Sequence, residues 1–77
     1  MYSLENIYLE NLIELRQENG YRQEDMAEIL DISLSSYARK ENGKTQFLMR
    51  EIAILVKLFD KPFAYIFRDY MDKIRVE

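Results

Sequence analysis

Residues 33–44, SLSSYARKENGK, gather positive charge on a chain that is acidic as a whole. The segment holds Arg39, Lys40 and Lys44 against a single acid, Glu41. The whole chain has 14 Asp and Glu against 11 Lys and Arg. Guanidinium and ammonium groups pair with phosphates and other anions. This segment is therefore the candidate for chemistry, either as a polyanion-binding site or as an ordinary solvated basic loop.

The uneven distribution of charge extends along the chain. Residues 1–31 carry two cations against eight acids, a net of −6. Residues 32–50 carry four cations against one acid, a net of +3, and residues 51–77 carry five of each. A cationic patch on an acidic body suits a polyanion site and disfavours non-specific contact elsewhere.

Composition excludes several classes of protein. With 77 residues, of which 48% are apolar and 32% charged, the chain has room for one small folded domain. The absence of Cys and His removes disulfides, thiolate metal sites and the usual acid–base residue. No catalytic, metal or cofactor motif is present, so we expect no enzyme activity, no cofactor and no small-molecule ligand. No apolar run approaches the roughly 18 residues that span a bilayer, and the N-terminus MYSLENIYLENL lacks a basic leader. We therefore expect a cytoplasmic protein that does not associate with membranes.

The elements that must position the basic segment are predicted to be helices. Apolar residues recur at spacings of three and four, as on the buried face of an amphipathic helix. The first such stripe consists of Leu4, Ile7, Tyr8, Leu12 and Leu15, with Ser3 as the N-cap and Asn19-Gly20 as the stop. Further helices are predicted over residues 23–30, from the Ser33 N-cap to Glu41, from Met49 to Phe59, and from Pro62 to Ile74. The pattern predicts an all-α fold of five helices around one core.

The connection between the second and third predicted helices is the informative one. Leu30-Asp31-Ile32-Ser33 leaves about three to four residues to turn the chain, which is typical of a helix-turn-helix motif. Such a motif holds its second helix outward, so that its N-terminal end can enter the major groove of DNA.

From Leu12 to Phe67 the sequence resembles the lambda-repressor/Cro-like (xenobiotic-response-element type) helix-turn-helix domain. The resemblance rests on Gly20, Gln23-Glu24-Asp25-Met26-Ala27, Ser33 and Glu41-Asn42-Gly43-Lys44, in that order and spacing. It implies a compact five-helix lambda-repressor-like fold for the single domain 1–77. The family-like core would be residues 12–67, and residues 68–77 would extend the C-terminal helix.

The resemblance also implies roles for individual residues. The base-contacting positions would be Leu34, Ser35, Ser36 and Arg39. The guanidinium of Arg39 could bind guanine O6 and N7, although a phosphate contact or a plain surface charge is the alternative. The positions that contact the DNA backbone would be Arg22, Gln23, Lys40, Asn42, Lys44 and Thr45. For Arg22 a solvated side chain is an equal alternative.

Other positions are expected to be structural. Arg16 and Glu41 match a family pair that bridges the first helix to the end of the third, and helical spacing places Tyr37 in the core. Asp31 and Asp60 stand where the family mostly has Gly, so we expect left-handed backbone with modest strain at both. Phe47 and Leu48 replace the usual cap before the fourth helix.

The C-terminal helix has more apolar length than a core of this size needs. Its apolar residues include Phe63, Ile66, Tyr70, Met71 and Ile74. One interpretation is a homodimer seam, which the family builds near this helix. The other is that Tyr70, Met71 and Ile74 fold back onto Leu4, Ile7 and Tyr8.

The function implied by the resemblance is that of a small prokaryotic or phage transcriptional regulator. It would be repressor-like and would bind double-stranded DNA sequence-specifically, as a homodimer, with its third helix in the major groove. The alternative is a protein-interaction module of the same fold, such as an antitoxin or anti-repressor, whose main partner is a protein. The acidic face of the first helix, with Glu5, Glu10, Glu14 and Glu18, keeps this alternative open.

Overall fold

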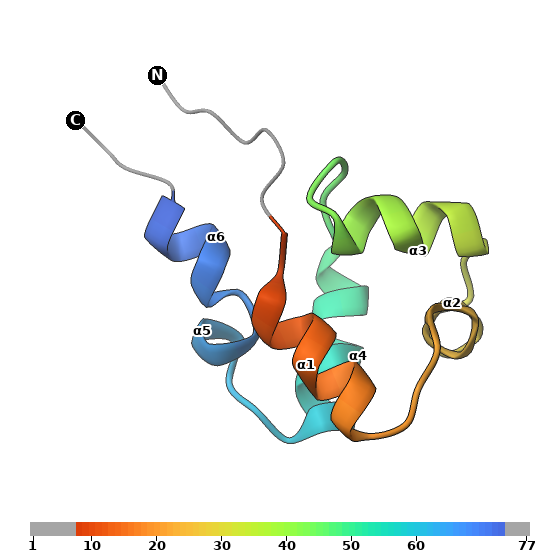
Figure 1. The fold of residues 1–77 in the computed structure, drawn as a ribbon, viewed down its shortest axis with the longest axis horizontal. Coiled ribbons are helices and arrows are strands. Elements are labelled where there is room, and N and C mark those ends of the chain that lie inside the picture. The colour runs from red at the N-terminus through yellow and green to blue at the C-terminus, as the bar shows by residue number, and fades with distance from the viewer. Residues whose placement is uncertain (1–7, 74–77) are drawn as a thin grey trace.

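The computed structural model describes residues 8–73, and this part of the chain is helical and contains no strand (Figure 1). The helices are α1 (Glu10–Glu18), α2 (Gln23–Leu30), α3 (Leu34–Glu41), α4 (Met49–Phe59), α5 (Phe63–Ile66) and α6 (Arg68–Lys73). The predicted all-α fold is confirmed. In Figure 1, α2 and α3 lie to one side of α1 and α4, and α5 and α6 lie to the other. No helix in the described range is long and apolar enough to cross a membrane.

Four left-handed residues end the first four helices. Gly20 and Gly43 follow α1 and α3 with φ of 76° and 77°. Asp31 and Asp60 end α2 and α4 with φ of 58° and 52°. The expectation that both Asp residues adopt left-handed backbone is confirmed. This conformation is what lets a helix stop within one residue and the chain change direction.

Replacing Asp31 with Gly is expected to stabilise the protein. Glycine has no Cβ and adopts positive φ without strain, and the change also removes a negative charge from the C-terminus of α2. We expect the free energy of unfolding in urea to rise by a few tenths to about 1 kcal/mol. Asp31→Asn, which tolerates the same conformation, is the control and should lie between parent and Asp31→Gly. A lower stability for Asp31→Gly would show that the strain at this position is negligible.

The core gathers residues from α1 to α5 and from the loops between them. Its fully buried apolar side chains are Leu12, Met26, Leu30, Tyr37, Leu55 and Ile66. Phe47, in the loop after α3, packs edge-to-face on Tyr37 at 6.1 Å and on Phe67 at 5.8 Å between ring centroids. Aromatic pairs in this arrangement add to the burial of apolar area. Phe47 therefore anchors the loop that follows α3 to the core.

The first helix begins later than the apolar spacing predicted. Tyr8 and Leu9 precede α1 and are not helical, and it is Leu9 that is buried, while Tyr8 is 50% exposed. The prediction that Tyr8 belongs to the buried stripe of a helix is therefore wrong. The reason is tertiary: the Leu9 N–H donates to the Glu41 carbonyl at 3.3 Å, so this residue follows the end of α3 instead of a helical path. The other residues of that prediction before Tyr8 (Ser3, Leu4 and Ile7) lie outside the described range.

A residue distant in sequence caps the start of α1. Asp69 of α6 accepts a hydrogen bond from the Glu10 N–H at 3.0 Å, and Asn11 donates its side-chain amide to the Tyr65 carbonyl at 2.8 Å. The first amides of a helix have no partner within the helix, and a carboxylate there also suits the helix dipole. These two bonds fasten the C-terminal segment to the first turn of α1.

The predicted continuous C-terminal helix is two short helices. Phe67, with φ −106° and ψ 25°, separates α5 from α6. Ile66 and Phe67 are both buried, although successive residues of a straight helix point about 100° apart. Ile66 is fully buried in the core, so its assignment to a dimer seam is wrong. Phe63 and Met71 remain 44% and 59% exposed, and Ile74 lies outside the described residues.

Candidate nucleic-acid interface

The turn between α2 and α3 is as short as the sequence pattern predicted. Asp31 reverses the chain in the left-handed conformation, and the Ile32 N–H donates to the Ala27 carbonyl at 2.9 Å. Ser33 then caps α3, with its Oγ accepting from the Ser36 N–H at 3.1 Å. A side-chain cap of this kind satisfies one of the free amides at a helix start. The two helices thus form a helix-turn-helix pair, and the first turn of α3 is capped by Ser33.

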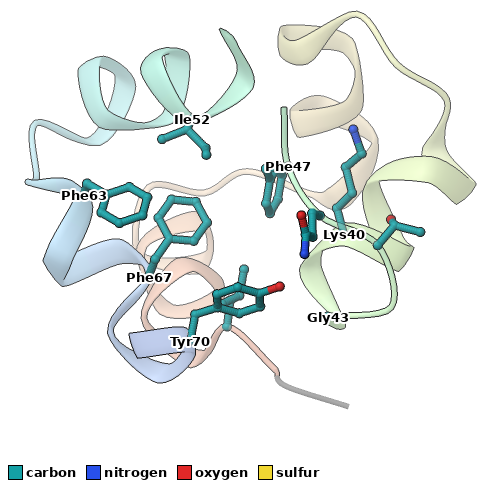
Figure 2. Close-up of a pocket in the computed structure, with 10 residues that line it drawn as sticks. Lys40, Gly43, Phe47, Ile52, Phe63, Phe67 and Tyr70 are labelled. Atoms are coloured by element: carbon teal, nitrogen blue, oxygen red, sulfur yellow. The ribbon is translucent and has the colours of Figure 1, made fainter. Parts of the chain in front are cut away.

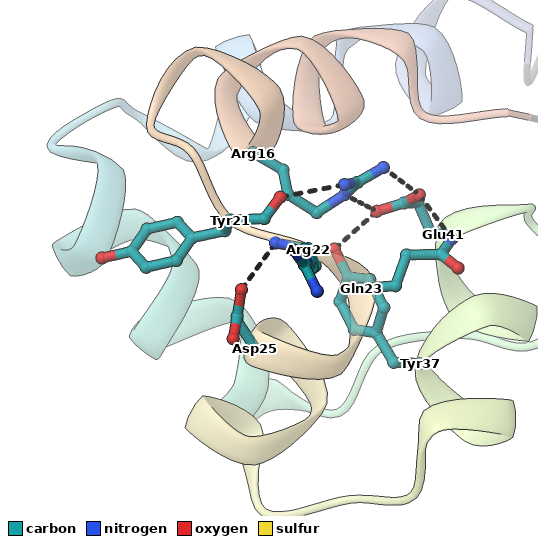
Figure 3. Close-up of polar contacts among 7 residues, drawn as sticks. All are labelled: Arg16, Tyr21, Arg22, Gln23, Asp25, Tyr37 and Glu41. Atoms are coloured by element: carbon teal, nitrogen blue, oxygen red, sulfur yellow. Dashed lines mark hydrogen bonds and ion pairs between the residues drawn. The ribbon is translucent and has the colours of Figure 1, made fainter.

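The inner face of α3 carries polar groups that are all used inside the protein. Tyr37, Lys40 and Glu41 are buried, and their spacing of three and four residues places them on one side of the helix. Glu41 is 2% exposed and is the centre of a network drawn in Figure 3. It accepts from Arg16 Nε at 2.8 Å and Nη2 at 3.1 Å, from Gln23 Nε2 at 2.9 Å and from the Tyr37 hydroxyl at 2.7 Å.

Arg16 and Glu41 form the ion pair that the family resemblance implied. The contact is bidentate, and the Arg16 side chain is 11% exposed. Arg16 also donates to the Tyr21 carbonyl at 3.1 Å, at the turn before α2. Because planar guanidinium–carboxylate pairs fix orientation as well as distance, this pair sets the end of α3 against α1 and the start of α2.

Tyr37 makes the stability of the protein depend on pH in the alkaline range. Burial raises the pKa of Tyr37 well above its usual value of 10.0, and the neighbouring Glu41 carboxylate adds to the shift. Above pH 10 the unfolded chain therefore loses this proton while the folded protein keeps it, so stability falls as pH rises. The parent's advantage over Tyr37→Phe in urea unfolding should shrink by about 1.4 kcal/mol between pH 9 and pH 11. A constant difference across this range would show that the hydroxyl is not held protonated.

The assignment of Lys40 to the DNA backbone is wrong. Its side chain points inward, is 10% exposed, and donates to Glu51 Oε1 of α4 at 2.6 Å. A sequence signal for this existed: Lys40 lies three residues after Tyr37, which the pattern already placed in the core. Lys40 was counted among the surface cations of the segment, whereas its charge is paired with Glu51 inside the protein.

The outer face of α3 holds the side chains that the resemblance assigned to base contacts. Leu34, Ser35 and Arg39 are exposed, with Leu34 at 49%, and Ser36 is partly buried. The Ser35 hydroxyl lies 3.4 Å from that of Ser33. This arrangement offers a guanidinium, hydroxyls and an apolar side chain along one side of a helix. These are groups that can bind guanine, phosphate and the thymine methyl respectively.

The residues assigned to phosphate contacts occupy different environments. Lys44 and Thr45 are exposed in the loop after α3, and their N–H groups donate to the Arg39 carbonyl at 2.8 Å and 3.4 Å. Asn42 ends α3 and is partly buried. Gln23 gives one of its two amide hydrogens to Glu41, so the other remains for a phosphate.

Arg22, just before α2, has an exposed side chain. The Arg22 side chain is 80% exposed, and its Nη1 lies 3.9 Å from Glu24 Oε1. A surface ion pair at this separation contributes little to stability. Both alternatives for Arg22, a phosphate contact and a solvated charge, are compatible with this position. Its N–H is capped by the Asp25 carboxylate at 2.8 Å, so α2 begins with a capped amide even though Arg22 cannot act as a Ser or Thr cap (Figure 3).

Two residues of α4 support the motif and were not identified from the sequence. Arg50 donates to the Leu30 carbonyl at 2.9 Å, at the end of α2. Glu51 is fully buried and accepts from the Leu48 N–H at 2.8 Å, which supplies the cap that the sequence at Phe47-Leu48 lacked. Glu51 stands three residues after Leu48, which is the spacing of the acidic residue in a capping box. This spacing could have predicted the cap from the sequence.

Comparison with known proteins agrees with this geometry. A protein-family model described as helix-turn-helix matches residues 12–66, which is more than two thirds of the chain. The chain belongs to this family of DNA-binding regulatory domains, which is not a family of enzymes. A search of curated proteins finds none that matches the sequence.

Proposed function

We propose that this protein is a small transcriptional regulator that binds double-stranded DNA sequence-specifically, with α3 in the major groove. The observation that carries the proposal is the division of α3 into two faces. The inner face is locked to the core by Tyr37, Lys40 and Glu41, while Leu34, Ser35 and Arg39 stay exposed on the other. A helix that is fixed to the core on one side and carries exposed side chains for base contacts on the other suits base recognition, since base contacts need a fixed orientation.

Electrostatics supports DNA as the partner but limits the strength of binding by one copy. In the described part of the motif, the exposed cations are Arg22, Arg39, Lys44 and Arg50, and Arg50 already binds the Leu30 carbonyl. If Arg22 and Lys44 each neutralise one phosphate, log K should fall with log salt with a slope of about −2 for one protomer and about −4 for two. A net charge of −3 opposes tighter non-specific binding.

Two copies would double the cationic surface, and we propose a homodimer on DNA that reads two half-sites about one helical turn apart. Of the residues expected in the dimer seam, Phe63 on α5 and Met71 on α6 are exposed and Tyr70 is half-buried. These three residues would form the seam on the described surface. Sedimentation with and without DNA tests this proposal. A single protomer on a two-site duplex, at protein concentrations that saturate binding, would contradict it.

The test of DNA binding is a titration of labelled duplexes followed by fluorescence anisotropy. A randomised duplex pool is first enriched on the immobilised protein, and the enriched sequence is then compared with a scrambled duplex across a salt series. We expect a salt-dependent affinity for both and a preference of at least about 10³ for the enriched sequence. Lys44→Ala should weaken binding to both duplexes and reduce the salt slope by about 1 for each bound protomer. A folded protein that binds neither duplex at low salt would refute the proposal and favour a protein partner.

A further inference from the structure

A buried ion pair joins the end of α3 to the start of α4 across the loop that carries Lys44 and Thr45. Lys40 Nζ and Glu51 Oε1 are 2.6 Å apart, and the two side chains are 10% and 0% exposed. They are eleven positions apart in the sequence, and the intervening loop contains the exposed residues assigned to phosphate contacts. The pair therefore closes this loop at its base.

Each end of the loop is fastened next to one member of the pair. At the first end, the Gly43 N–H donates to the Lys40 carbonyl at 3.2 Å and the Lys44 N–H donates to the Arg39 carbonyl at 2.8 Å. At the second end, the Leu48 N–H donates to the same Glu51 oxygen that accepts from Lys40. One carboxylate oxygen thus holds both the last turn of α3 and the first residue before α4.

The surroundings leave the pair little freedom to move. Figure 2 shows Lys40 beside Phe47 at the edge of an apolar hollow whose other lining residues include Phe67 and Tyr70. The Lys40 ammonium lies 6.0 Å from the centre of the Phe47 ring. With apolar groups around its stem, Lys40 has Glu51 as its anionic partner in the structure. Its neighbour Arg39 points about 100° away around the helix, toward solvent.

Stability alone is a poor explanation for this pair. Desolvating two charges costs as much as their attraction returns, and apolar residues of the same size commonly replace such pairs without loss. Glu51 Oε2 is also buried without a hydrogen-bond partner, which adds to the cost. What the pair does provide is one defined distance between the ends of the loop.

We infer that Lys40 and Glu51 are positioning residues for DNA binding: their ion pair holds the loop of residues 42–48 in the conformation that presents Lys44 and Thr45 to phosphate. This inference rests on the proposed function, because it assigns the pair to the same interface. Neither side chain touches DNA. The pair acts through the loop that it closes.

The double variant K40M/E51Q tests the inference. Met keeps the apolar stem of Lys40, Gln keeps an oxygen for the Leu48 N–H, and neither leaves an unpaired buried charge. The net charge of the protein is unchanged, so the long-range field toward DNA is preserved. The matched control is E14Q/K57Q, which also removes one charge of each sign, at exposed positions on α1 and α4.

Two measurements are made on parent, variant and control. In anisotropy titrations we expect K40M/E51Q to lose on the order of tenfold in affinity and to reduce the salt slope by about 1 for each bound protomer, the value for one lost phosphate contact, while the control matches the parent. By NMR hydrogen exchange we expect the Lys44 amide to lose protection in K40M/E51Q, while core amides such as that of Leu55 keep it. A variant that merely loses stability would lower protection throughout.

The outcomes separate this inference from the proposed function. If the parent binds DNA, an unchanged affinity and salt slope in folded K40M/E51Q would overturn the positioning role. If the parent does not bind DNA, the proposed function fails, and unchanged protection of Lys44 would then show that the pair does not hold the loop either. Should K40M/E51Q not fold, K40M/E51L, with apolar side chains at both positions, is measured in its place and must show the same changes.

Discussion

Replacing Glu41 with Ala is expected to remove about half of the stability of this protein. The change leaves the Arg16 guanidinium nearly buried with no counter-charge, and it removes the acceptor for Tyr37 and Gln23. Losing one partner of a buried pair costs about 3–5 kcal/mol. A domain of this size has on the order of 5–10 kcal/mol in total. Urea unfolding followed by circular dichroism gives the free-energy difference directly.

Two further variants identify the cause of that loss. Glu41→Gln keeps the volume and one acceptor oxygen but removes the charge, so we expect it to lose at least half as much as Glu41→Ala. Glu28→Ala removes an exposed carboxylate of α2 and should change stability by no more than about 0.5 kcal/mol. A Glu41→Gln protein as stable as the parent would mean that hydrogen bonding, and not charge, holds this junction.

Replacing Arg39 with Ala is expected to reduce sequence preference more than general affinity for DNA. Arg39 is exposed on α3, one turn after the positions assigned to base contacts, and its guanidinium can donate two hydrogen bonds to one guanine. We expect a loss of about 1–3 kcal/mol on the enriched duplex. The loss on a scrambled duplex should be much smaller. Anisotropy titrations on both duplexes measure this difference.

The comparison with Lys44→Ala makes the Arg39 result specific. A phosphate contact contributes equally to every sequence, so Lys44→Ala should weaken both duplexes alike. Circular dichroism should show both variants folded, because neither side chain is buried. If Arg39→Ala also weakens both duplexes equally, then Arg39 binds phosphate and the specificity lies with Leu34, Ser35 and Ser36.

The charged side chains of residues 33–44 lie in two environments. Lys40 and Glu41 face the core, where each pairs with a residue of another helix, Glu51 and Arg16 respectively. Arg39 and Lys44 remain in solvent. With so few exposed cations on an acidic protein, we expect non-specific binding to be modest and its dependence on salt to be shallow for one copy, and we expect two copies to bind together.

Most of the fold could be predicted from the sequence because its signals are local. Helical spacing of apolar residues, the Ser33 cap and the Gly at the ends of α1 and α3 depend on neighbours a few residues away. The left-handed backbone at Asp31 and Asp60 is likewise a property of a helix end. The face of α3 is local too: the spacing that placed Tyr37 in the core also places Lys40 and Glu41 there. The Arg16–Glu41 pair was implied by resemblance to a family and not by geometry.

The sequence by itself therefore determined the helix-turn-helix, the Ser33 cap and the outward direction of Arg39. Only the tertiary structure decided which partner each buried charge meets, where α1 begins and how the C-terminal segment returns. The cap that Asp69 provides to Glu10 joins residues that are far apart in the chain. The physical reason is that periodicity reports which side of a helix is buried. The energy of a buried charge or an open helix end depends on whatever other element comes to lie against it.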